Sequence, residues 1–556
     1  MSVASVSFSA AREAGRTVDR LLERPRTVLG VLVCAQLAGT LLLAVTIPHN
    51  GWVFFQGGDQ IGFSTTGWLA GQLDLPPTET AYLWPFVQAP VTWVTGPTYL
   101  QAVPALILLQ VLVLAPIAVL CIYGIAARIG GRLLGYWASL LWIIAPFAAI
   151  PLFTERYQER WTEHFLPQAL GLTAMADYAS MVLVLAAAFF ALRSLSPNRL
   201  ADAVFAGLLI GAAGALKPPN LLVAVGVGLA YLAARRWREG VACAAAAVPA
   251  LLVLVLWKYR GLGEIPAFAL EQARLAAGSG PVALSLDRYL ELDVDHWRKQ
   301  MNYLREFFWS ARLAQWVPFA GLLAVLRMWR GAVAALLAGW LGAFLVVKGF
   351  STRADIEANT FWRLLMPAWP AYLLLFASIP LLIPTLARRL GERLHTTVGG
   401  PIAPRWIALA AVLSVAVPAV AIAASSRIEP PTPAVVQEFP TGNILTPVDE
   451  SIELEVERTG SGQELTWTTG SWRANVFYRV YRTDQPGQDV QCALSSGAAW
   501  SCFLRTTPIH TTREQMFVDT SRSAGATYRI GVGTNWLDDP EQGDIFAFSP
   551  PVSAAR

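Results

Sequence analysis

The chain has little charge for its length. Only 14% of its 556 residues are Asp, Glu, Lys or Arg, whereas 55% are hydrophobic and the mean hydropathy is +0.46. A soluble protein of this size carries more charge on its surface, so the composition indicates an integral membrane protein. The basic residues occur in small scattered groups and form no continuous stripe, which argues against a nucleic-acid-binding surface. We therefore expect no DNA or RNA partner.

Cysteine and histidine are also sparse, with five of each. No spacing of these residues is typical of a metal site, so we expect no cofactor, although a divalent metal on carboxylates stays open. Cys34, Cys121 and Cys243 lie in apolar segments and are expected to be packing residues. Cys492 and Cys502 lie in a polar tail, and they can form a disulfide if that tail is in an oxidising compartment.

Long apolar runs dominate the rest of the chain. A membrane-spanning helix needs roughly 17 to 25 apolar residues, and the sequence offers about eleven candidates. The fold class predicted for this region is therefore an α-helical polytopic membrane protein. The predicted spans are Val28–Ile47, Val103–Ala126, Leu133–Phe153, Tyr178–Leu192, Ala201–Leu216, Leu221–Ala234, Val241–Trp257, Leu313–Met328, Ala332–Val347, Leu364–Ile383 and Ile407–Ala424.

Arginines occur at every second connection between these spans. Because basic residues are retained on the cytoplasmic side, the N-terminal segment 1–27 is expected inside and the C-terminal tail outside. The first span has no small-x-small cleavage site after it and is expected to stay as an anchor. We predict a multi-pass protein of the cytoplasmic membrane, with the outer loops at 48–102, 154–177, 217–220, 258–312 and 348–363.

The character of the chain changes after the membrane region 28–424. A Pro-rich linker, 425–444, leads into residues 445–556, where period-2 alternation predicts an all-β sandwich domain. The clearest predicted strands are Leu465–Trp467, Val476–Tyr481 and Thr527–Val532. This tail resembles a fibronectin type III or similar immunoglobulin-like module, a kind of domain that binds or positions other molecules.

Asp59 is the first candidate for chemistry, because it stands in the outer loop just after the first span. A carboxylate at a membrane face can meet both a lipid-borne substrate and water, although Asp after glycines is also common in turns. In the same loop the pair Trp84-Pro85 predicts a turn.

Asp177 begins the fourth span, where an acid is either functional or simply favoured by the helix dipole. Lys217 precedes two prolines at an outer span end, where it binds phosphate or snorkels to headgroups.

The other outer loops add further ionisable residues. Glu163 and His164 lie in the charged second outer loop, which also fits a solvated helix surface. Arg353 and Arg363 bracket the loop before the tenth span, and guanidinium groups match phosphate oxygens well. Amphipathic stretches near residues 284–304 predict helices lying in the membrane interface.

The order of these motifs resembles the integral-membrane GT-C glycosyltransferases, especially protein O-mannosyltransferases and aminoarabinose transferases. The matching features are an acidic motif in the first outer loop (Gly58-Asp59-Gln60), a basic hairpin after the second span (127–132), Lys217-Pro218, and Arg363 followed by Pro367. Many relatives carry two acids in the first motif. Here the second position is Gln60, which argues against metal binding by that pair and leaves Gln60 as a candidate substrate contact.

The resemblance implies transfer of a sugar from a polyprenyl-phosphate carrier to a glycan, lipid or protein acceptor, with inversion. In that interpretation Asp59 is the general base, Asp177 is a second catalytic candidate, and the outer cations hold the carrier phosphate. A transporter or lipid-linked-sugar flippase is one alternative, but the charges cluster at span ends and no inverted repeat is evident. A membrane-anchored adhesion protein is another, although it would need far fewer spans.

Overall fold

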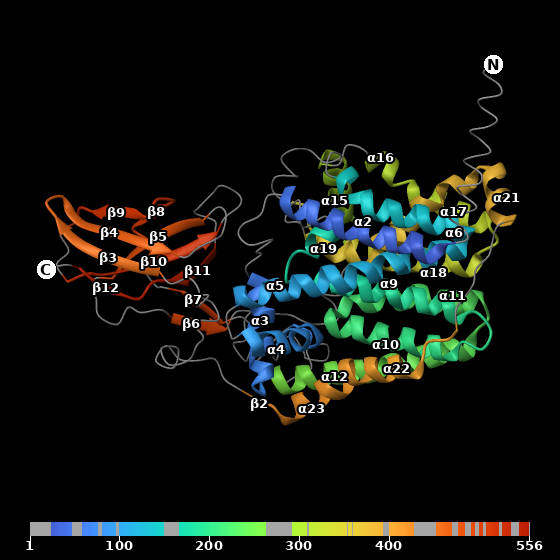
Figure 1. The fold of residues 1–556 in the computed structure, drawn as a ribbon, viewed down its shortest axis with the longest axis horizontal. Helices are drawn as coiled ribbons and strands as arrows, with labels where there is room; N and C mark the ends of the chain where they lie inside the picture. The colour runs from blue at the N-terminus through green and yellow to red at the C-terminus, as the bar shows by residue number, and fades with distance from the viewer. Residues whose placement is uncertain are drawn as a thin grey trace, which may run out of the picture.

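The computed structural model describes residues 24–46, 58–75, 80–95, 99–149, 166–262, 292–307, 311–352, 354–357, 360–392, 400–427, 452–469, 476–483, 491–494, 500–503, 507–521, 525–534 and 544–554, and the account below keeps to these. A body of long helices is followed by a domain of strands, which lies beyond the end of the body where α3, α4 and α5 are found (Figure 1).

Each of the predicted apolar segments overlaps helical structure. In the described residues, seven helical stretches are long and apolar enough to cross a membrane. Four lie within single helices: α2 (Pro25–Thr46), α9 (Ala176–Ser194), α18 (Gly331–Gly349) and the part Trp237–Gly261 of α12 (Trp237–Leu262). The other three combine several elements: Ala102–Ala149 (most of α5, Tyr99–Leu109, with η1, Gln110–Leu114, and α6, Ala115–Ala149), Thr360–Leu382 (α19, Thr360–Leu365, to η6, Ile379–Leu382) and Pro404–Ala424 (α22 to α23). Three shorter apolar helices, α10 (Leu200–Leu216), Pro218–Ala233 (η3 and α11) and α17 (Val317–Arg327), match the remaining predictions. The chain is a multi-pass α-helical membrane protein.

The longest helical stretch contains two predicted spans joined by a break. Gly130 and Gly131 leave helical geometry, and Gly131 has φ of 81°, a conformation that glycine adopts without the Cβ penalty of other residues. Beyond this hairpin the two halves run side by side, since Tyr123 and Tyr136 stack with ring centroids 5.3 Å apart. The predicted basic hairpin at 127–132 is therefore a turn between two spans.

Small residues allow close packing in the middle of the bundle. α10 packs against both α9 and α12. A Cβ on Gly211 would lie 2.7 Å from the carbonyl oxygen of Ala247 on α12, so only glycine lets these backbones approach so closely. This is the small-residue packing expected of helices that associate in a membrane. α10 also packs along α9, and its C-terminal end lies beside the start of α9.

Two helices, α3 (Gly58–Gly71) and α4 (Leu83–Thr95), occupy the first predicted outer loop and pack on each other. The prediction of a turn at Trp84-Pro85 was wrong. Pro85 lies in the first turn of α4, where its missing N–H has no intrahelical partner to lose and its fixed φ suits a helix. Strand β1 (Asp74–Leu75) then pairs in parallel with β2 (Ser426–Arg427), which ties α3 to the end of α23 (Val417–Ala424).

An amphipathic helix, α15 (Val294–Phe307), covers the second of the amphipathic stretches singled out in the sequence, whereas the first, at 284–290, lies outside the described residues. Its place in the membrane interface stays a prediction. The ring of Trp297 stacks on Phe350 with centroids 4.7 Å apart, and the backbone N–H of Ile356 donates to Oε1 of Gln300 over 2.7 Å. α15 thus holds the connection between α18 and α19.

The C-terminal domain has the predicted β-sandwich form. One sheet has the order β3 (Ile452–Thr459), β4 (Gly462–Thr469), β9 (Met516–Asp519). The other has the order β11 (Asp544–Phe548), β10 (Thr527–Thr534), β5 (Val476–Thr483), β8 (His510–Thr512), with β12 (Val552–Ser553) also on β10. The predicted strands lie in β4, β5 and β10. Trp467 and Tyr478 meet between the sheets with ring centroids 5.5 Å apart.

A buried carboxylate ties the two sheets together. Asp519 accepts hydrogen bonds from the Tyr528 hydroxyl at 2.7 Å, from Arg482 at 2.9 Å and from the Ser521 hydroxyl at 2.6 Å. Burial alone raises the pKa of Asp519, but the hydrogen bonds from Ser521, Tyr528 and Arg482 outweigh it and lower the pKa from 3.8 to about 2. The carboxylate form of Asp519 is therefore part of the folded domain.

The two tail cysteines face each other across a strand pair. β6 (Gln491–Leu494) and β7 (Trp500–Phe503) are antiparallel, and Cys492 is opposite Cys502 in the register. Opposed Cα atoms in such a ladder are about 4.5 to 5.5 Å apart, which is within the range that a disulfide spans. The sulfur atoms lie outside the described part of the chain, so the bridge stays a prediction.

Candidate functional site

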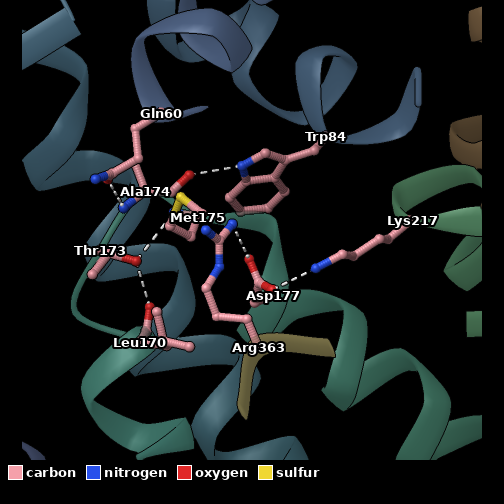
Figure 2. Close-up of polar contacts among 9 residues, drawn as sticks. All are labelled: Gln60, Trp84, Leu170, Thr173, Ala174, Met175, Asp177, Lys217 and Arg363. Atoms are coloured by element: carbon pink, nitrogen blue, oxygen red, sulfur yellow. Dashed lines mark hydrogen bonds and ion pairs between the residues drawn. The ribbon is translucent and has the colours of Figure 1, made fainter. Parts of the chain in front are cut away.

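A carboxylate and two cations from three helices meet at one end of the helical bundle. Asp177 lies in the first turn of α9 and is only 3% exposed. Nζ of Lys217 is 2.7 Å from Oδ1 of Asp177, and a terminal guanidinium nitrogen of Arg363 is 3.6 Å from Oδ2. Figure 2 shows both cations reaching the same carboxylate from different sides. Each carboxylate oxygen therefore has its own cationic partner.

The position of Lys217 follows from the proline after it. Pro218 disfavours helical geometry in the residue before it, and Lys217 is extended, with φ of −155° and ψ of 110°. The Lys217 N–H still donates to Ala213 O at 3.0 Å, and Asn220 Nδ2 donates to the same carbonyl at 2.8 Å. The carbonyl of Ala213 in the last turn of α10 thus has two donors, and the side chain of Lys217 points toward α9.

The segment that leads into Asp177 is held by hydrogen bonds to both backbone groups of one residue, Ala174. The Ala174 N–H donates to Oε1 of Gln60 at 2.6 Å, and Nε1 of Trp84 donates to the Ala174 carbonyl at 2.8 Å (Figure 2). Gln110 donates to the carbonyl of Thr173. Because Gln60 and Trp84 come from α3 and α4, the helices of the first predicted outer loop fix where α9 begins.

Arg363 is positioned from the opposite side. Its helix, α19, continues into η5 (Met366–Ala368), where Nε1 of Trp340 donates to the carbonyl of Pro367 at 2.9 Å. The first turn of α19 is also held in place, since the Phe361 N–H donates to Asp355 O at 3.1 Å. α19 therefore starts from a hydrogen-bonded turn, which reduces the freedom of the arginine.

The cluster of Asp177, Lys217 and Arg363 is electropositive, and its two cations are partly exposed. Two cations surround one carboxylate, so the cluster has a formal charge of +1. The side chains of Lys217 and Arg363 remain 26% and 22% exposed, whereas that of Asp177 is 3% exposed. Partly exposed cations held in place by a buried anion are suited to binding a second, incoming anion, above all a phosphate with several acceptor oxygens.

The structure brings four predicted site residues together: Gln60, Asp177, Lys217 and Arg363. The backbone of Asp59 belongs to the first turn of α3, directly before Gln60, and its side chain lies outside the described residues. Glu163, His164 and Arg353 also lie outside them. In the described ranges no group of three or more His, Cys, Asp or Glu residues is arranged to hold a metal ion.

Sequence reasoning missed the neutral hydrogen-bonding residues of this region. Trp84 was assigned only to a turn, and Gln110 and Gln168 received no role. Nε2 of Gln168 donates to the Trp142 carbonyl at 2.9 Å, and both glutamines are buried. An isolated amide within a long apolar run, such as Gln110, is a signal that could have identified them, because a polar group in a membrane span needs a partner.

When the chain is compared with known proteins, it is similar only to solved structures. No family model matches the chain, and no curated protein matches it either. The oligosaccharyltransferase of Archaeoglobus fulgidus in the apo form is 12% identical at a TM-score of 0.40, over 76% of this chain and 58% of that protein, so the chain spans less than two thirds of the archaeal enzyme. ArnT from Cupriavidus metallidurans is 15% identical at a TM-score of 0.42, over 71% of this chain and 74% of ArnT.

The archaeal enzyme, AglB, has also been solved with an inhibitory peptide and a dolichol-phosphate, where the match is 13% identical at a TM-score of 0.39. Both neighbours belong to the GT-C group that the sequence resembles. Similarity at this level assigns no activity to this chain, whose function is therefore argued from its own residues.

Proposed function

We propose that this chain transfers a sugar from a polyprenyl-phosphate carrier to an acceptor hydroxyl at the outer face of the cytoplasmic membrane. The observation that carries the proposal is the convergence of Lys217 and Arg363 on Asp177 at the ends of three apolar helices. A lipid-linked phosphate needs fixed cations at headgroup depth, where its chain stays in the bilayer and its sugar reaches water. The partly exposed side of the cluster offers two such cations.

Asp177 acts in this proposal as a positioning residue. The sequence made Asp177 a candidate for catalysis, but both of its carboxylate oxygens engage cations, which leaves it poorly placed to accept a proton from an acceptor. Its carboxylate keeps the ammonium of Lys217 and the guanidinium of Arg363 oriented before the donor arrives. Such preorganisation lowers the cost of binding the phosphate.

Asp59 is the proposed general base. It takes the proton of the acceptor hydroxyl while that oxygen attacks the anomeric carbon from the face opposite the phosphate. The bond between the anomeric carbon and the phosphate oxygen breaks, the phosphate leaves on its carrier, and the configuration inverts. Support comes from Gln60, which hydrogen-bonds Ala174 and so holds the first turn of α3 near the start of α9. Glu163, His164 and Arg353 are proposed to contact substrate.

The β-sandwich domain is proposed to bind the acceptor or to shape its approach. Its two sheets, with orders β3-β4-β9 and β11-β10-β5-β8, support the fibronectin type III-like assignment, because the chain passes between them after β4, β8 and β9, as expected of an immunoglobulin-like sandwich. The domain packs around Trp467 and has no part in the cationic cluster that the structure describes.

The experiment uses the full chain in lipid nanodiscs with a polyprenyl-phosphate sugar extracted from the native membrane. Sugar transfer and release of polyprenyl phosphate are measured for the wild type, Lys217→Ala and Arg363→Ala. Arg298→Ala is the matched control, since Arg298 is an exposed cation on α15 whose side chain is 71% accessible. We expect transfer to fall in the first two variants alone. Undiminished transfer in both, with folding intact, would refute the proposed phosphate site.

A further inference from the structure

A second group of charged residues lies at the other end of α9, about 24 Å from Asp177 at 1.5 Å per helical residue. There Arg193 and Arg199 share the carboxylate of Asp202, each with a nitrogen 3.4 Å from a different oxygen. Asp202 is fully buried, and its Oδ1 also accepts the N–H of Ile402 over 2.9 Å. One carboxylate therefore serves two arginines and a backbone donor.

A third guanidinium joins this group from the basic hairpin of α6. Arg128 donates to the carbonyl of Gly124 at 2.8 Å and lies 5.1 Å from the centroid of the Phe189 ring. Arg193 lies over the same ring, at 5.7 Å. Arg128 is also near enough to Arg193 and Arg199 for their like charges to repel it, and near enough to Asp202 for that carboxylate to attract it. The α6 hairpin, the end of α9 and the residue before α10 thus contribute three arginines, two of which lie over the Phe189 ring.

The charge of this group is not balanced. Three guanidinium groups and the carboxylate of Asp202 have a formal charge of +2. The helix dipoles at the end of α9 and at the end of the first half of α6 offset a part of it. The side chains of Arg193 and Arg199 are only 15% and 11% exposed, so water solvates them poorly. A bound anion would reduce the repulsion among these like charges, which is weakly screened where side chains are buried.

We propose that Arg128, Arg193 and Arg199 bind the phosphate headgroup of an anionic lipid in the membrane leaflet at this end of the helices. Guanidinium groups match phosphate oxygens in shape and charge. These arginines lie at the ends of apolar spans, which is the depth of lipid headgroups, and basic groups between spans are suited to anionic lipids there. In the expected topology this is the inner leaflet. The inference is independent of the proposed activity and of the Asp177 site.

The test measures lipid retention by the full chain with native mass spectrometry in detergent. Phosphatidylglycerol, which is anionic, and phosphatidylcholine, which is zwitterionic, are titrated separately onto delipidated protein. The wild type is expected to retain one phosphatidylglycerol at concentrations where phosphatidylcholine is not retained. Arg128→Gln is expected to weaken that affinity about tenfold, as for loss of one charge-assisted contact. Arg238→Gln, an exposed arginine at the start of α12, is the matched control.

Arg128→Lys guards against a failure to fold, because it keeps the charge and loses only the planar fork and its ring contact. It is expected to bind more weakly than the wild type and more tightly than Arg128→Gln. Equal losses in Arg128→Gln and Arg238→Gln would overturn the proposal, since they would indicate general attraction to a basic surface. Inorganic phosphate that displaces the lipid completely at low millimolar concentration would also overturn it, because the site would then recognise a soluble anion. Equal retention of the two lipids is the third contradictory result.

Discussion

Replacing Lys217 by methionine tests whether the cationic cluster is a phosphate site or only a structural ion pair. Methionine keeps most of the length of the side chain and removes the charge. A charge-assisted contact with a phosphate contributes about 1.5 to 3 kcal/mol, so donor affinity should fall about 10- to 150-fold. The cost in folding should be smaller, about 1 to 2 kcal/mol, because Lys217 is a quarter exposed and Asp177 keeps Arg363.

A double-mutant cycle separates these two effects. Asp177→Asn combined with Lys217→Met removes both members of the ion pair and returns the cluster to a formal charge of +1. Since neither charge is then left without its partner, the double variant should be about 1 kcal/mol more stable than the sum of the single variants predicts. Its donor affinity should lie above that of Lys217→Met, because the double variant lacks the Asp177 carboxylate, which in the single variant still repels the phosphate and neutralises the charge of Arg363.

The assay is equilibrium binding of the polyprenyl-phosphate donor in nanodiscs, in parallel with thermal unfolding of each variant. Lys299→Met, which removes an exposed lysine on α15, is the control and should bind the donor as the wild type does. If Lys217→Met binds the donor with unchanged affinity, the reasoning fails. The cluster would then be a structural ion pair, and the phosphate would bind elsewhere.

Three further predictions concern other parts of the chain. Asp59→Asn should lower sugar transfer roughly 100-fold or more while the protein stays folded in the membrane, which single-turnover kinetics would measure; normal transfer would remove Asp59 from the mechanism. Cys492 and Cys502 should be bridged, and mass spectrometry of unreduced protein from its native membrane would contradict this by finding two free thiols. Asp519 should stabilise the β-sandwich by about 2 kcal/mol above pH 4, because its pKa falls from 3.8 to about 2 on folding. That contribution is lost as the pH falls toward 2, so chemical denaturation of Asp519→Asn should show less pH dependence over this range than the wild type.

The sequence predicted the elements of the fold well because apolar length and period-2 alternation are local signals. The spans around α9, α10 and α18 differ from their predicted bounds by a few residues, and strands β4, β5 and β10 include the predicted runs. The pair α3 and α4 was not predicted. These helices combine glycine, proline and short apolar runs, and they are stabilised by contacts with each other and with α9 that no local pattern contains.

The candidate site likewise depends on contacts between residues far apart in the sequence, which local patterns do not predict. Asp177, Lys217 and Arg363 could each be selected from the sequence, because a charged residue at the end of an apolar span is costly and so calls for a reason. Their pairing could not, since Lys217 is 40 residues from Asp177 and Gln60 is 114 residues from its partner Ala174. A lone acid at a span end suggests a base, whereas an acid between two cations has both oxygens engaged. For this reason the proposed role of Asp177 moves from proton transfer to positioning, and in the proposed function the two cations are the groups that meet the phosphate of the donor.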